Sequence, residues 1–148
     1  MRFFKTIFLA VIVFLGAGCA ATGPKYSDIA STIPSLAANK GRVFFFRPDT
    51  MLGAAITSDI RVNGNVVGKS ERGSFFFVDQ VPGNITVSTS TEVEKQLTFT
   101  LAAGETKYVK TTVSFGVLVG RINSALVNST EAKTEIAGLA YTGTPLKK

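Results

Sequence analysis

Beyond its first quarter, the chain alternates between short apolar runs and clusters of glycine, proline and asparagine. In one run, Ile85, Val87 and Thr89 share one face of an extended segment, and Thr86 and Ser88 share the other. A period of two is typical of β-strands that have one buried and one solvent-facing side. Several short runs of this kind, separated by turn residues, predict an all-β sandwich or barrel.

We predict a mainly β fold, a single small β-sandwich of about seven to eight strands with a short C-terminal helix. The turn residues support this assignment. Asn63 and Gly64 tolerate the positive φ of a tight hairpin, and Pro82-Gly83 suits a chain reversal. The predicted strands are Arg42–Arg47, Ser58–Val62, Val66–Lys69, Ser74–Gln80, Asn84–Thr91, Lys95–Leu101, Thr106–Ser114 and Val117–Asn123.

The helix is predicted near the C-terminus. Asn128 is a favoured N-cap residue, and Glu131 stands three positions later, as in a capping box. A helix running to about Ile136 would place Ala132 and Ile136 against the sheet. The tail, Tyr141–Lys148, is expected to be loosely held.

Two runs break the period of two. Val43–Phe46 and Phe75–Val78 are apolar at every position, so both faces of each segment need cover. The favoured interpretation is a central strand, with the opposite sheet on one face and the N-terminal segment or the C-terminal helix on the other. The alternative is an exposed aromatic patch that binds a partner or touches lipid.

The first 18 residues have the pattern of an export signal. Arg2 and Lys5 precede an apolar run, Ile7–Leu15, which is shorter than the roughly 20 residues of a membrane span. Small residues then lead to Cys19, the single cysteine. This ending resembles the lipobox of bacterial lipoproteins, although Gly16 stands where leucine is usual. The alternative is an ordinary cleavable signal that leaves Cys19 as a free thiol.

The lipobox resemblance implies a lipid anchor. Cleavage would occur before Cys19, whose thiol would receive diacylglycerol and whose new amine would be acylated, with palmitate as a typical chain. Each buried methylene contributes about 0.8 kcal/mol, so several chains hold a protein firmly in a membrane. The residue after the cysteine is Ala20, whereas an aspartate at that position would favour retention in the inner membrane. We therefore expect a protein of the cell envelope, in the outer membrane and facing the periplasm.

This interpretation divides the chain into three parts. Residues 1–18 are the lipoprotein signal peptide, residues 19–39 the lipidated cysteine and a tether, and residues 40–148 the β-sandwich domain. A fully extended tether would reach on the order of 65 Å, although its apolar residues favour partial docking on the domain. Removing the signal, which holds two of the 16 basic residues, leaves 14 against 10 acidic residues. A net charge of +4 without a dense basic run does not indicate nucleic-acid binding.

Candidate catalytic chemistry is sparse in this sequence. Histidine is absent, which removes the usual general base of a hydrolytic triad and the commonest metal ligand. We expect no enzyme activity, cofactor or metal site. The remaining catalytic alternative is a small envelope hydrolase that uses carboxylates such as Asp79 or Glu94, with Glu92 on the same face of an extended segment as Glu94.

A second alternative is an anion-binding site. Four arginines, Arg47, Arg61, Arg72 and Arg121, would hold an anionic glycan or lipid if the fold brought them together. Scattered, solvated arginines are the more ordinary interpretation.

Five motifs resemble bacterial lipoproteins that carry the domain of unknown function numbered 2846, over roughly residues 38–123. The same motifs are similar to the PEGA-type segments of surface proteins. The resemblance implies a small β-sandwich on an exported, often lipidated protein, and it implies no catalytic residues. We therefore expect a non-enzymatic envelope module with a protein, lipid or glycan partner. The motifs are Gly41-Arg-Val-Phe-Phe-Phe-Arg-Pro48, Ile60-Arg-Val-Asn-Gly-Asn-Val-Val-Gly68, Phe76-Phe-Val-Asp79, Pro82-Gly83 and Gly104-Glu-Thr-Lys-Tyr108.

Overall fold

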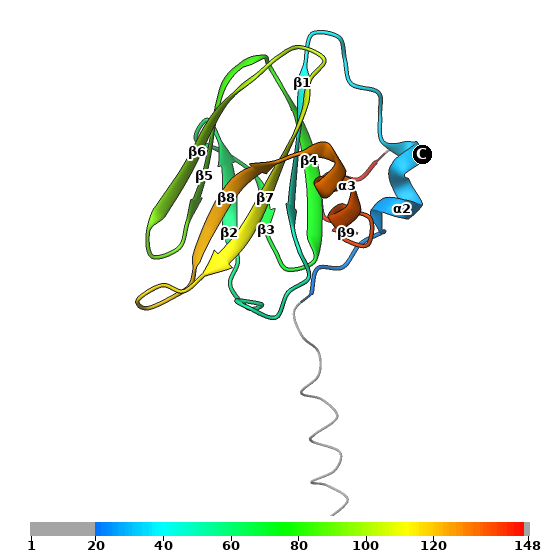
Figure 1. Cartoon of the computed structure of the whole chain (residues 1–148). Helices are drawn as coiled ribbons and strands as arrows, with labels where there is room; N and C mark the ends of the chain where they lie inside the picture. Colours follow the sequence, from blue (N-terminus) through cyan, green and yellow to red (C-terminus); the bar gives the residue numbers. More distant parts are fainter. Residues whose placement is uncertain (1–19, 147–148) are drawn as a thin grey trace, which may run out of the picture.

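Two sheets face each other in the computed structural model, which describes residues 20–146 (Figure 1). One sheet has the order β8-β7-β1-β4-β9 and the other β3-β2-β5-β6. The mainly β prediction is therefore confirmed. The strands are β1 (Gly41–Arg47), β2 (Ser58–Val62), β3 (Asn65–Ser70), β4 (Ser74–Gln80), β5 (Gly83–Ser90), β6 (Glu94–Leu101), β7 (Thr106–Ser114), β8 (Arg121–Val127) and β9 (Ala140–Tyr141).

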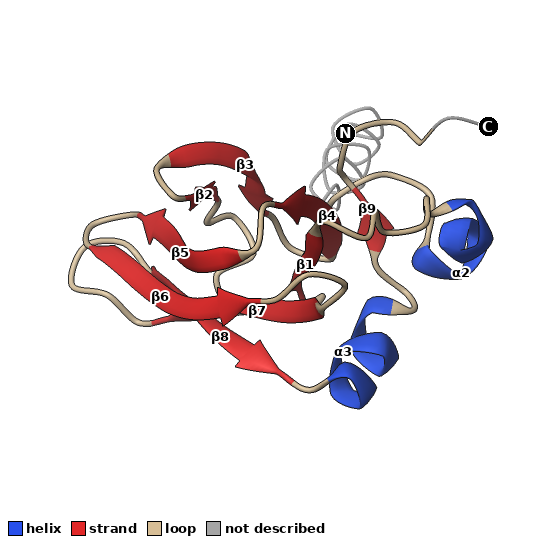
Figure 2. Cartoon of the chain, turned by 90° about the horizontal axis from the view of Figure 1, so that it is seen from above, coloured by secondary structure: helices blue, strands red, loops and turns tan. Residues whose placement is uncertain are grey.

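Strand β1 lies at the centre of the five-stranded sheet, antiparallel to β4 and parallel to β7. Between β4 and β7 the chain forms β5 and β6 of the four-stranded sheet. This crossover lets β7 run parallel to β1. Seen from above, α2 (Tyr26–Ile29) and α3 (Ser129–Ile136) lie on the side of the five-stranded sheet that faces away from β2 and β5 (Figure 2). A short 3-10 helix, η2 (Ala30–Thr32), continues α2.

The phenylalanine runs belong to the core, as expected of central strands, with Phe77 and Val78 half-buried and the other positions buried. Phe45 and Phe76 stack between the two sheets with ring centroids 5.1 Å apart. Gly68 on β3 makes room for them, since a Cβ there would lie 2.5 Å from the Phe76 ring. On the other face, Phe44 lies 5.3 Å from the rings of both Phe77 and Tyr108. The alternative of an exposed aromatic patch at these two runs is therefore wrong.

The N-terminal segment and α3 cover the outer face of the five-stranded sheet. Tyr26 of α2 meets Phe75 edge-on, with ring centroids 5.5 Å apart. Helix α3 begins as predicted, because the Asn128 side chain accepts a hydrogen bond from the backbone N–H of Glu131 at 2.9 Å. Its buried residues are Ala132 and Ile136, as the sequence pattern predicted.

In the described part of the chain, no helix has the length and apolar character needed to cross a membrane.

Two predictions about the C-terminal half are wrong. The tail is not loose at its start, because Tyr141 is buried in β9, which pairs with β4. The last long strand is Arg121–Val127 and not Val117–Asn123. The strand start was predicted too early because of a contact between distant segments. The carboxylate of Glu92 accepts hydrogen bonds from the backbone N–H groups of residues 117–119 and holds them in a loop.

Candidate binding site

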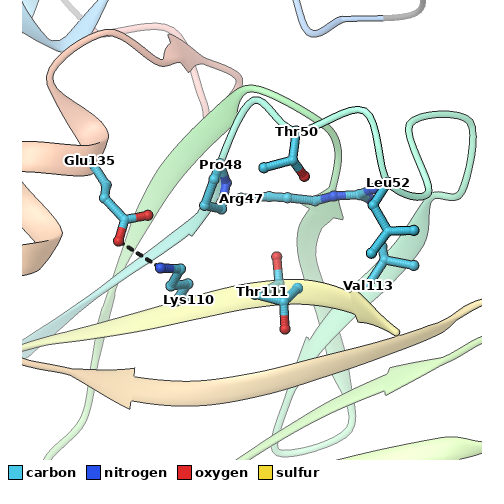
Figure 3. A pocket seen from close by; sticks show the side chains of 9 residues that line it. Arg47, Pro48, Thr50, Leu52, Lys110, Thr111, Val113 and Glu135 are labelled. Atoms are coloured by element: carbon cyan, nitrogen blue, oxygen red, sulfur yellow. Dashed lines mark hydrogen bonds and ion pairs between the residues drawn. The ribbon is translucent and has the colours of Figure 1, made fainter. Parts of the chain in front are cut away.

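A pocket of about 430 Å³ lies where the end of β1 meets β7 and α3 (Figure 3). Lys110 on β7 and Glu135 on α3 point toward each other on one side, and Arg47 extends between Thr50 and Thr111. The remaining lining is mostly apolar and comes from the segment after β1 and the end of β7. The pocket is lined by Arg47, Pro48, Thr50, Leu52, Lys110, Thr111, Thr112, Val113 and Glu135.

Lys110 is held by two carboxylates of α3. Its Nζ donates to Glu135 Oε1 at 2.6 Å and lies 3.5 Å from Glu131 Oε1. The hydrogen bond to Glu135 raises the pKa of Lys110 above its ordinary value, with a smaller contribution from the charge of Glu131. The amine therefore stays protonated at neutral pH, which suits recognition of a polar group and not nucleophilic attack.

Arg47 is buried and organises the segment that follows β1. Its Nη2 donates to the carbonyl of Gly53 at 2.6 Å, and its Nη1 donates to the carbonyl of Ile56 at 2.5 Å. Burial lowers the pKa of Arg47, with a further contribution from the positive charge of Arg72. The guanidinium thus ties the β1–β2 connection to the sheet and forms one wall of the pocket.

Buried hydroxyls join the two sheets behind Arg47. Thr111 Oγ1 and Ser70 Oγ lie 2.8 Å apart, and Arg47 Nη1 also lies 3.4 Å from the Ser70 carbonyl. These groups fix the back of the pocket, because a buried hydroxyl without a partner would cost free energy. The result is a pocket with an apolar wall, buried hydroxyls and a charged rim.

The four predicted arginines are not gathered around one site. Arg72 Nε donates to Asp49 Oδ1 at 2.5 Å, and Arg121 Nε donates to Glu92 Oε1 at 2.9 Å. Arg61 lies on β2 of the other sheet, where its guanidinium reaches the Gly64 carbonyl and is 4.0 Å from Asp59. Arg47 and Arg72 are the two that influence each other.

The candidate carboxylates are also separated. Asp79 forms a two-pronged ion pair with Arg42, at 2.6 and 2.8 Å, on the outer face of the five-stranded sheet. Glu94 is the first residue of β6 in the other sheet. Leu101, the last residue of β6, pairs with Gly83, which follows the end of β4, the strand that contains Asp79. Asp79 and Glu94 therefore lie near opposite ends of the sandwich and do not form the pair that a carboxylate hydrolase needs.

The pocket residues Lys110, Thr111 and Glu135 were not among the sequence candidates. One signal was available, since Glu131 and Glu135 are four positions apart and share a face of α3. Their partner was not identifiable, because pairing a strand lysine with a helix 25 residues later requires the tertiary fold.

Glu92 provides a pH-dependent test of how the loop between β7 and β8 is held. Hydrogen bonds from Leu118 and Val117 lower the pKa of Glu92 from an ordinary 4.5 to about 2. Its stabilising effect is thus fully present above pH 4.5 and is lost as the pH falls toward 2. Urea unfolding should show Glu92→Gln less stable than wild type at pH 7, with the difference shrinking below pH 4.5.

Glu94→Gln is the matched control, since Glu94 is exposed and its carboxylate accepts a hydrogen bond from the neighbouring Gln96 side chain. It should leave stability nearly unchanged across the same range. A destabilisation by Glu92→Gln that is equal at pH 7 and pH 2.5 would contradict the assigned role of the carboxylate.

The geometry defines a class of protein: a small two-sheet β-sandwich with a pocket beside its larger sheet. Residues 37–122 match the family described as protein of unknown function (DUF2846), and the chain therefore belongs to this family. It is also 25% identical over 114 residues to an uncharacterized protein of Haemophilus influenzae, an alignment that covers 76% of this chain and 67% of that protein. No solved structure matches the chain.

Proposed function

We propose that this protein is a lipoprotein of the bacterial cell envelope, anchored in the outer membrane through Cys19, with a non-enzymatic binding module facing the periplasm. The observation that carries the proposal is the position of a lone cysteine between a segment with the sequence pattern of an export signal and a folded domain. Cys19 itself lies outside the described residues. The likeness to PEGA-type segments of surface proteins, based on the hairpin around Asn63-Gly64, is part of the same proposal.

The start of the described chain supports a short connection between anchor and domain. The backbone N–H of Ala21 donates to the Arg72 carbonyl at 3.0 Å, and Lys25 forms a β-bridge with Ala140. Tyr26, Ile29 and Ile33 then pack against the core. With its apolar residues docked in this way, the N-terminal segment does not extend as a long tether, so the domain would lie close to the membrane surface.

Cys19→Ser is expected to abolish lipidation and to shift the protein out of the outer-membrane fraction. The physical reason is that the serine hydroxyl does not replace the thiolate that receives the diacylglycerol group. Incorporation of labelled palmitate and membrane fractionation measure the two effects. Ala20→Asp is the companion variant and should keep the label while moving the protein to the inner membrane. Undiminished labelling of Cys19→Ser would contradict the proposal.

The binding module has its own test. A photoreactive amino acid in place of Thr50, at the rim of the pocket, should give a specific crosslinked product in intact cells. The matched position is Thr100, which is exposed on β6 of the other sheet. Equal products from both positions would contradict a binding role for the pocket.

A further inference from the structure

The loop between β7 and β8 presents apolar side chains to solvent. Phe115 is 85% exposed, Val117 83% and Leu118 89%. A folded domain gains free energy by burying such side chains, so three of them at one loop tip mark an interaction surface.

This loop is held in its outward shape by Glu92. The carboxylate accepts hydrogen bonds from the N–H groups of Val117 and Leu118 at 2.9 Å and of Val119 at 3.3 Å. At Gly116, a side chain would collide with the Val119 carbonyl and with Glu92 itself. The backbone is therefore fixed with its apolar side chains pointing away from the domain, and they do not fold back onto it.

A second loop extends the same surface. In the β1–β2 loop, Met51 is 75% exposed and Leu52 49%. Leu52 and Ile56 line a shallow hollow together with the tip of the β7–β8 loop, so the two loops are in contact. We call this surface the apolar end; it consists of Met51, Leu52, Phe115, Val117, Leu118 and Val119.

The N-terminal end of the described chain is next to these loops. Ala20 lines one hollow with Thr57 and Glu71 and another with Asp49 and Gly73. Asp49 and Thr57 bracket the β1–β2 loop. In Figure 1, the blue start of the coloured chain and the two loops of the apolar end all lie at the lower end of the sandwich. The position that follows the proposed anchor and the exposed apolar side chains are thus at the same end of the domain.

We propose that the apolar end is a membrane-contact surface, which inserts into the boundary between headgroups and acyl chains of the bilayer that holds Cys19. The inference rests on the proposed lipid anchor. Aromatic and aliphatic side chains at convex loop tips suit this boundary, where apolar groups leave water without needing a shaped partner. The anchor raises the local concentration of the loops at the membrane, so even weak insertion orients the domain.

The test uses the full chain purified from membranes and reconstituted in vesicles of phosphatidylethanolamine and phosphatidylglycerol. An environment-sensitive fluorophore on Val117→Cys is compared with one on Val66→Cys, which is exposed near the β2–β3 turn, at the other end of the domain. Quenchers attached to the acyl chains should quench the label at 117 several-fold more than the label at 66. Phe115→Ser with Leu118→Ser should reduce quenching at 117 toward the level at 66.

The matched control pair is Val66→Ser with Val81→Ser, two exposed valines away from the apolar end, which should leave quenching at 117 unchanged. Equal quenching at 117 and 66 would overturn the proposal. A blue-shifted label at 117 that acyl-chain quenchers do not reach would also overturn it, since the occupant would then be a protein surface. Palmitate labelling of the same preparation reports separately on the anchor, so failure of the anchor and failure of the membrane contact are distinguishable.

Discussion

Phe45→Ala is expected to lower the free energy of unfolding by about 3–5 kcal/mol. Phe45 is fully buried in the central strand β1 and stacks on Phe76 of β4, between the two sheets. Removing its ring deletes apolar contacts on all sides and leaves a cavity, because strands fixed by backbone hydrogen bonds on both sides cannot close around the gap. Urea unfolding followed by circular dichroism would measure the loss.

The same substitution at Phe115 is the matched control. Phe115 is also a phenylalanine in the five-stranded half of the molecule, but its side chain is 85% exposed at the apolar end. Phe115→Ala should therefore change the free energy of unfolding by less than about 0.5 kcal/mol. A loss at Phe115 as large as the loss at Phe45 would mean that the β7–β8 loop packs on the domain, which would contradict both the fold description and the membrane-contact proposal.

Arg47→Met is expected to lower the free energy of unfolding by about 3 kcal/mol. The side chain is only 2% exposed, and its guanidinium donates to the carbonyls of Gly53 and Ile56. Methionine fills similar space without donors, so these carbonyls would lose their partners, at a cost of about 1–3 kcal/mol for each one left unsatisfied. Relief from burying a charge offsets part of this cost.

Arg61→Met is the control for this prediction, since the Arg61 side chain is 46% exposed and its loss should cost less than about 0.5 kcal/mol. Limited proteolysis should also cut the β1–β2 connection faster in Arg47→Met, because the guanidinium ties that segment to the sheet. Unchanged stability and unchanged cleavage would show that the segment is held without Arg47.

The prediction of an anion site from arginine residues illustrates a limit of sequence reasoning. Arg47 is one of the four arginines that would bind an anion if the fold brought them together, yet its donors serve backbone carbonyls of a loop. Arg121 is another of the four, and it contacts the Glu92 carboxylate. Residue type indicates what a side chain is able to bind, but its partner depends on which segments the fold brings within hydrogen-bond distance.

Local interactions explain the predictions that succeeded. The Asn63-Gly64 turn, the alternation at Ile85–Thr89 and the Asn128 cap each depend on neighbours within a few residues, so the sequence contains all the information they need. The predicted bounds of Ser58–Val62 and Ser74–Gln80 agree with the structure for this reason. The start of β8 was wrong because Glu92, about 25 residues before the loop, captures backbone groups that the apolar pattern assigned to a strand.

By itself, the sequence determined the mainly β class, most strand positions and the capped helix, because periodicity and turn chemistry are local properties of the chain. The lipid anchor at Cys19 stays a prediction from the leader pattern. Only the tertiary structure decided that the phenylalanine runs are core, that Lys110 meets α3 at a pocket, and that Phe115 and Leu118 are exposed at the end where residue 20 lies. These features depend on contacts between segments distant in sequence, and their geometry follows from how the two sheets pack.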